Sequence, residues 1–273
     1  MLHEQGYQLQ FSGLATAMYM WNDCFSQPRD LDVKVWRYMD FSKFIYMLHT
    51  DKLFFSRVDK LIDPFEGSSP KEVIKSRKKL LAQIEEDPQY NNNPAKRAEI
   101  LESYENISDT FAAFTKFTAV NCWHMNSTES MAMWKLYLSS NEGIAIQTTY
   151  RRLMNSFNSV EDTINIGLIS YIDYDNETFS MLNMDNWFMH KRSCFEYENE
   201  IRCLVHKTPN NWRDEPIMNE GVGITIDTDV LIENIYCSPN SPQWFLETVK
   251  TTVSKFGKKY TCSESSLATK PNF

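Results

Sequence analysis

Three glutamates recur at every second position of the segment 191–206, KRSCFEYENEIRCLVH. They are Glu196, Glu198 and Glu200, and Arg202 continues the alternation. Because side chains of a strand alternate between its two faces, a strand over this segment would place all four on one side. Neighbouring like charges repel, and burial raises the pKa of a carboxyl group, so such a cluster is costly to build.

Two interpretations of this charged strand stay open. In one it is a solvated edge strand with an ion ladder to Lys191, Arg192 and Arg202, since structural ion networks also cluster charge. In the other it is an active-site strand. An oxocarbenium-like transition state, formed when a glycosidic bond breaks, is stabilised by a fixed negative charge. Glu198 and Glu200 would then divide charge stabilisation and base catalysis between them.

A second candidate group lies near the N-terminus, in Trp36-Arg37-Tyr38 and at Ser56. An arginine can hold a phosphate through two hydrogen bonds, and an adjacent aromatic ring can stack on a base or a nicotinamide. The alternative is a core tryptophan beside an Arg37 that pairs with a surface carboxylate. Ser56 would either bind a ribose hydroxyl or cap the following turn.

Asp63 and Glu66, in the segment DPFEG, are expected to form a turn or to pair with Arg37. Together with Glu198 and Glu200 they also define an alternative chemistry, in which four carboxylates bind Mg²⁺ in a metal-dependent nuclease.

Two further groups are candidates for chemistry or ligand contact. Cys122 and His124 share a face of a predicted strand and form a conceivable nucleophilic pair, but no orienting acid is near them in sequence. Met133, Trp134 and Tyr137 belong to a predicted short helix, where core packing is the default and stacking of Trp134 on a ligand is the functional alternative.

Periodicity and turn signals predict strands and helices that interleave without a strict βαβ rhythm. The predicted strands cover residues 35–39, 52–56, 117–124, 143–149, 166–174, 191–206, 221–228 and 231–239. The predicted helices cover residues 41–51, a pair within 70–112, and 130–138, 150–157 and 243–255. We expect an α+β fold with a mixed, twisted central sheet and surrounding helices, in one domain over residues 1–273 with a helical insertion at about 70–112. Residues from Ser263 onwards are expected to form a frayed tail.

Composition narrows the function classes. The 273 residues carry a net charge of −8, which disfavours a protein that coats nucleic acid. No run approaches the ~18 apolar residues of a membrane span, and no N-terminal signal is present, so we expect a cytoplasmic protein without membrane contact. The six cysteines show no CxxC spacing and the five histidines no HExxH motif, which predicts reduced thiols and no metal site.

The ordered set WRY, LFFS, DPFEG, ESMAMWKLY and FEYENEIR resembles a bacterial family known as a domain of unknown function. Members of that family are often found near mobile or defence genes. The resemblance covers residues from about Val35 to Val205 and implies no activity.

A more distant resemblance is to ADP-ribosyltransferases. These enzymes place an Arg or His on a first strand, a Ser or an aromatic residue on a second, and a catalytic Glu on a late strand, often as ExE. That resemblance implies that Arg37 holds the pyrophosphate of NAD and Ser56 the nicotinamide ribose. Glu200 would stabilise the ribosyl cation and Glu198 would position the acceptor nucleophile.

The resemblance also implies that Tyr38 or Trp134 stacks on the nicotinamide. The expected function is therefore transfer of ADP-ribose from NAD, as a substrate, to a nucleic-acid or protein acceptor, in a toxin or anti-phage defence effector with an antitoxin or defence partner. The alternatives are the metal-dependent nuclease and a non-catalytic sensor of a nucleotide or phage protein.

Overall fold

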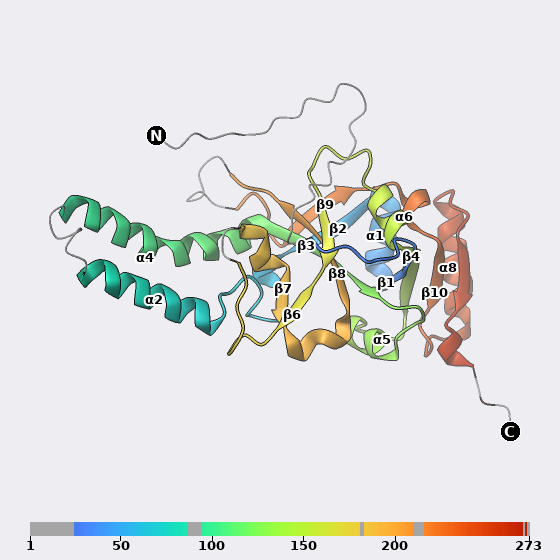
Figure 1. Cartoon of the computed structure of the whole chain (residues 1–273). Helices are drawn as coiled ribbons and strands as arrows, with labels where there is room; N and C mark the ends of the chain where they lie inside the picture. The colour runs from blue at the N-terminus through green and yellow to red at the C-terminus, as the bar shows by residue number, and fades with distance from the viewer. Residues whose placement is uncertain (1–24, 87–93, 181–182, 210–215, 270, 272–273) are drawn as a thin grey trace.

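A computed structural model describes residues 25–86, 94–180, 183–209, 216–269 and 271. Its centre is a mostly antiparallel nine-stranded sheet (Figure 1), in which seven strands run in the order β11-β10-β4-β1-β3-β2-β9. The other two are β8, which pairs with β3, and β5, which pairs with β8. The strands are β1 Lys34–Asp40, β2 Lys52–Arg57, β3 Thr118–Met125, β4 Gly143–Thr149, β5 Asn165–Leu168, β8 Glu200–His206, β9 Gly221–Thr225, β10 Asn234–Cys237 and β11 Thr261–Glu264.

Only β10 and β11 run parallel within this sheet, so it is mixed, as predicted. A separate parallel pair consists of β6 Ser170–Ile172 and β7 His190–Arg192. The predicted α+β class with a mixed central sheet is confirmed.

Strand β3 connects two halves of the sheet that diverge from it. One edge of β3 pairs with β8 along nearly its whole length. The opposite edge is shared, because β1 reaches it at Val35 and Trp36 whereas β2 reaches it at Ser56 and Arg57. Residues 121–123 lie between these two contacts and pair with neither strand on that edge. We call this opening the fork.

Helices cover one face of the sheet and bury the largest apolar cluster there. They are α1 Phe41–Thr50, α6 Tyr150–Asn155, α7 Thr228–Leu231 and α8 Gln243–Lys255. On α1 the buried residues are Phe44, Met47 and Leu48, at the spacing of one helix face. Helix α1 connects the end of β1 to the start of β2. Because its apolar stripe is buried against the sheet, it fixes the positions of these two strands, which border the fork.

The other face is covered by short elements. Helix α5 Met131–Tyr137 packs Met133 and Trp134 against Trp36 and Tyr38 of β1. The 3-10 helices η1 Val58–Lys60 and η2 Met184–Phe188 and the pair β6-β7 cover the rest of that face. The candidate site lies on this more thinly covered face.

Two long helices, α2 Lys71–Glu86 and α4 Pro94–Phe117, occupy the segment predicted as a helical insertion. Figure 1 shows them side by side, projecting away from the sheet. Within α2 only Val73 and Ile84 are buried, so most of that helix faces solvent. Within the described residues, no helix has both the length and the apolar character that crossing a bilayer requires.

The prediction of one continuous strand over 191–206 is wrong. Strand β7 ends at Arg192, and the chain then turns through the 3-10 helix η3 Ser193–Glu198 before β8 begins at Glu200. Asn199, between them, has a left-handed backbone with φ +39°, which breaks the extended alternation. As a result Glu196 is exposed, whereas Glu198 and Glu200 are buried.

The prediction of a frayed tail from Ser263 is also wrong. Strand β11 adds to the sheet beside β10, and Ser265 and Ser266 bond to Glu129, which precedes α5. Backbone hydrogen bonds at a sheet edge need no apolar pattern, so TCSESS gives no strand signal in the sequence. The predicted strand at 166–174 is divided at Ile169 into β5 and β6.

Candidate active site

A cavity of about 340 Å³ opens on the thinly covered face, beside the fork. Its size falls within the range of small-molecule sites. Five of the six residues proposed from the sequence line it, and they come from four separate elements: Arg37 and Tyr38 from β1, Ser56 from β2, Glu198 from η3 and Glu200 from β8. We call this space the fork cavity.

The sixth residue, Trp134, does not line the fork cavity. Its indole nitrogen donates a hydrogen bond to Glu129, 3.1 Å away, and it is 3% exposed. Its ring packs edge-on against Tyr38 with centroids 4.9 Å apart. The hydroxyl of Tyr38 in turn accepts a hydrogen bond from the backbone N–H of Ser130. Trp134 therefore holds Tyr38 in place from behind, and stacking of Trp134 on a ligand in this cavity does not fit its position.

Arg37 reaches into the fork, where strand pairing has stopped. Its Nη1 donates to the backbone carbonyl of Cys122 at 2.6 Å. On the other side of the opening, the side-chain amide of Asn121 donates to the carbonyl of Phe54. These two side chains donate hydrogen bonds to backbone carbonyls beside the gap in strand pairing. Because those carbonyls are satisfied, the fork costs little free energy of folding.

Among the described residues, Arg37 forms no salt bridge, although it lines a cavity rich in carboxylates. Burial lowers the pKa of its guanidinium below the usual range. Arg37 is half-buried. A cation partly withdrawn from water without a carboxylate partner is destabilised, and binding of an anion beside it reduces that cost. Arg37 is thus the group in this cavity best suited to hold a phosphate or another anion.

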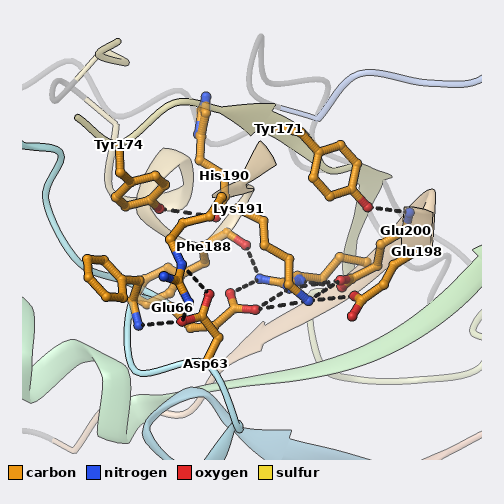
Figure 2. A network of polar contacts seen from close by, with 12 residues as sticks. Asp63, Glu66, Tyr171, Tyr174, Phe188, His190, Lys191, Glu198 and Glu200 are labelled. Atoms are coloured by element: carbon orange, nitrogen blue, oxygen red, sulfur yellow. Dashed lines mark hydrogen bonds and ion pairs between the residues drawn. The ribbon is translucent and has the colours of Figure 1, made fainter. Parts of the chain in front are cut away.

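Five charged residues form a buried network along one wall of the cavity (Figure 2). Lys191 reaches Glu198 at 2.6 Å, Glu200 at 3.3 Å and Glu66 at 3.4 Å. Arg202 binds Glu200 at 2.6 Å and Glu66 at 2.8 Å, and is itself fully buried. Three carboxylates against two cations leave the wall with one net negative charge when all five are ionised.

The two catalytic candidates differ in their electrostatic surroundings. Burial alone would raise the pKa of Glu200, but Arg202 and Lys191 outweigh it and hold that pKa at about 2. For Glu198, burial is the largest influence and raises its pKa above the usual range, against the opposing effect of Lys191. Glu200 is therefore a permanent anion, whereas Glu198 is closer to exchanging a proton near neutral pH.

His124 also lines the cavity, one strand away from Arg37. Its Nδ1 lies 2.5 Å from the carbonyl of Glu198, which accepts a hydrogen bond only if Nδ1 carries the proton. Burial lowers the pKa of His124, which favours the neutral ring. Its Nε2 is buried and has no partner among the described residues, so it can accept a hydrogen bond from a ligand.

The structure argues against a Cys122–His124 nucleophilic pair. Burial and the nearby Glu200 raise the pKa of the Cys122 thiol well above its usual range, so the thiolate is disfavoured. The five cysteines within the described residues are all free, and Cys24 lies outside them.

The carboxylates proposed for a nuclease are each paired with a cation. Asp63 binds Arg192 at 2.7 Å, Glu66 binds Arg202, and Glu198 and Glu200 share Lys191. In the part of the chain that the structure describes, no group of three or more His, Cys, Asp or Glu side chains is arranged to hold a metal ion.

Sequence reasoning missed the aromatic wall of the cavity. Tyr137 from α5 and Phe195 and Tyr197 from η3 complete the lining. The helix pattern pointed to a packing role for Tyr137, and the strand predicted over 191–206 hid the turn that brings Phe195 and Tyr197 to the cavity. Only a prediction of the η3 turn could have found Phe195 and Tyr197.

Comparison with known proteins assigns no family or function to this chain. No family model matches the chain, and neither the curated proteins nor the solved structures contain a match. The two resemblances noted from the sequence therefore stay predictions.

Proposed function

We propose that this protein cleaves the nicotinamide–ribose bond of NAD and transfers ADP-ribose to a macromolecular acceptor. The observation that carries the proposal is that Arg37, Ser56, Glu198 and Glu200, from four separate elements, line one cavity. In the part of the chain that the structure describes, the arginine has no carboxylate partner there. Their order along the chain agrees with the ADP-ribosyltransferase plan, since β1, β2 and β8 carry the Arg, the Ser and the late Glu.

Binding follows from the lining of the fork cavity. Arg37 would hold the pyrophosphate of NAD, because that guanidinium forms no salt bridge with any residue that the structure describes. Ser56 would hydrogen-bond the nicotinamide ribose, and the ring of Tyr38 would pack against the nicotinamide. The neutral His124 offers its free Nε2 to a ribose hydroxyl or to the carboxamide.

The chemistry uses the net negative charge of the charged wall. As the glycosidic bond breaks, its electron pair leaves with nicotinamide, which departs neutral, and positive charge develops on the ribose. Glu200 is ionised throughout and would stabilise that charge. Glu198 would accept the proton of the acceptor nucleophile as the new bond forms at the anomeric carbon. This route uses protein side chains alone and calls for no metal.

The test measures nicotinamide release from NAD by chromatography, in wild type and in three glutamine variants. We expect Glu200→Gln and Glu198→Gln each to lower turnover by roughly 100-fold or more, the usual effect of removing a transition-state charge or a base. Glu196→Gln is the matched control, because Glu196 belongs to the same segment but is exposed and does not line the cavity. Circular dichroism and thermal melting show whether each variant is folded.

Arg37→Gln tests the binding half of the proposal. Loss of a charged hydrogen bond to phosphate should raise KM for NAD by roughly 10- to 100-fold. Folded Glu200→Gln and Glu198→Gln proteins with full nicotinamide release would refute the mechanism. Wild-type protein that neither binds nor consumes NAD would refute the proposed function. The acceptor, the defence role and an antitoxin or defence partner follow from the resemblance only and are part of the proposal.

A further inference from the structure

A second cavity, of about 430 Å³, lies where the helical pair joins the sheet. One side is formed by η1 and the segment after it, with Val58 and Leu61. The other side is formed by the end of α4, with Phe111 and Thr115, and by Trp187 of η2. We call this space the hairpin cavity. Its walls are largely apolar and its volume suits a ring system of nucleoside size.

Two buried polar atoms on residues that line this cavity have no hydrogen-bond partner within the described residues. They are Nε1 of Trp187 and Oγ of Ser68. Trp187 is 2% exposed, and its ring stacks on Phe111 at 3.6 Å between centroids while Phe179 packs against it edge-on. Buried donors are nearly always partnered in proteins. A rigid indole N–H and a hydroxyl, unpaired in the same lining, are the arrangement expected of a site that receives a hydrogen-bond acceptor.

The charges around the cavity favour a neutral acceptor over an anion. Asp59, Asp63 and Glu66 line it, and each is paired with an arginine. None of the lining residues is a lysine or an arginine. A phosphate or carboxylate would thus meet carboxylates with no free cation. A ring carbonyl carries no such penalty, and its two lone pairs can accept from an indole N–H and a hydroxyl.

We propose that the hairpin cavity binds a nucleobase through a ring carbonyl, which accepts hydrogen bonds from Trp187 Nε1 and Ser68 Oγ. Uracil, thymine, cytosine and guanine have such a carbonyl, whereas adenine does not. A carboxamide side chain has the same acceptor but is too small to fill the apolar part of the cavity.

The hairpin cavity adjoins the fork cavity, since Leu61, Asp63 and Glu66 line both. A base bound there would lie next to the site at which NAD is cleaved. Its nucleotide or nucleic acid would then be the acceptor, a step that rests on the proposed function. Binding of the base itself does not rest on it.

The experiment observes the indole N–H directly. Protein labelled with ¹⁵N-tryptophan is titrated with uridine, thymidine, guanosine or adenosine, without NAD, and the indole resonances are followed by NMR. Trp187→Phe keeps an aromatic ring beside Phe111, removes the N–H, and identifies the Trp187 signal by its loss. We expect uridine, thymidine or guanosine to shift that signal, and adenosine to bind more weakly.

Two variants test the donors by calorimetry. Trp187→Phe and Ser68→Ala should each weaken binding of the responsive nucleoside by about 2- to 10-fold, the worth of one neutral hydrogen bond. Glu198→Gln, in the fork cavity, should leave that affinity unchanged. Ser68→Ala removes a single oxygen, so it remains informative if Trp187→Phe is unstable.

The proposal is overturned if no nucleoside shifts the Trp187 signal, or if both donor variants bind as well as wild type. It is also overturned if N-acetylasparagine amide shifts the signal while nucleosides do not, because the site would then recognise a protein side chain. The two proposals can fail separately. A protein that binds no nucleoside can still release nicotinamide from NAD, and a protein that releases no nicotinamide can still bind a nucleoside. A short oligonucleotide of the preferred base that binds more tightly than the free nucleoside identifies a nucleic acid as the source of the base. Equal affinity identifies a free nucleotide.

Discussion

Replacement of Arg202 by methionine tests the charged wall most directly. Arg202 is fully buried, binds Glu66 and Glu200, and also donates to the carbonyl of Phe188 at 2.7 Å. Methionine keeps much of the volume but removes the charge, so the three carboxylates Glu66, Glu198 and Glu200 are left to share Lys191. Breaking a buried ion pair by removing one partner typically costs about 3–5 kcal/mol.

An independent route gives a similar magnitude. Arg202 and Lys191 hold the pKa of Glu200 at about 2, against a usual value of 4.5. A difference of that size corresponds to roughly 3 kcal/mol of stability at neutral pH. Because much of this stabilisation comes from Arg202, we expect Arg202→Met to lower the free energy of unfolding at pH 7 by about 3 kcal/mol or more.

The assay is urea unfolding followed by circular dichroism, with Arg151→Met as the matched control. Arg151 pairs with Asp32 in an exposed salt bridge at 2.8 Å, a type of pair worth about 0–1 kcal/mol. Both variants replace an arginine by methionine, so the difference between their free energies of unfolding reports the effect of burying the ion pair. If Arg202→Met were as stable as Arg151→Met, the argument that the wall depends on Arg202 would be refuted.

The same pKa predicts how the difference depends on pH. A carboxyl whose pKa is lowered by folding stabilises the protein above its unfolded pKa and loses that contribution as pH falls through its folded pKa. Wild type should therefore lose the contribution of Glu200 between pH 4.5 and about 2, whereas Arg202→Met has less of it to lose. The stability difference between the two proteins should narrow over that interval, and a constant difference would contradict the assignment.

Two further predictions concern the frame around the cavities. Gly67→Ala should destabilise the protein by about 1–2 kcal/mol more than Gly257→Ala. Both glycines have φ +73°, so the backbone strain of an alanine is the same at both. At Gly67 an added Cβ would lie 2.9 Å from a threonine methyl, whereas at Gly257 nothing lies within 4 Å. Thermal melting of the two variants measures the difference, and equal melting temperatures would contradict it. Glu129→Ala should free the segment that carries Ser265 and Ser266, because that carboxylate accepts from both serines. Amide hydrogen exchange in β11 should then be faster in the variant than in wild type. Unchanged exchange rates in β11 would show that strand pairing alone holds the segment.

Much of the architecture could be predicted because local signals agree with it. The helix of α1 follows from the apolar spacing of Phe44, Met47 and Leu48, and the turn at Asp63 follows from the proline after it. For the segment 191–206, the same local signals predicted one continuous strand, which is wrong. Alternating charges fit a strand, but they fit equally well a short turn followed by a strand, and the left-handed Asn199 that decides between them leaves no periodic trace.

By itself, the sequence determined which residue types were available for chemistry and which elements would carry them, because periodicity and turn propensities act over a few residues. Only the tertiary structure decided which of them meet. Arg37 and Glu200 are far apart in the chain and line one cavity because β3 holds their strands on opposite edges. Burial, too, is a property of the folded whole: it distinguishes Glu196, left in solvent, from Glu198 and Glu200, which are buried beside Lys191 and Arg202.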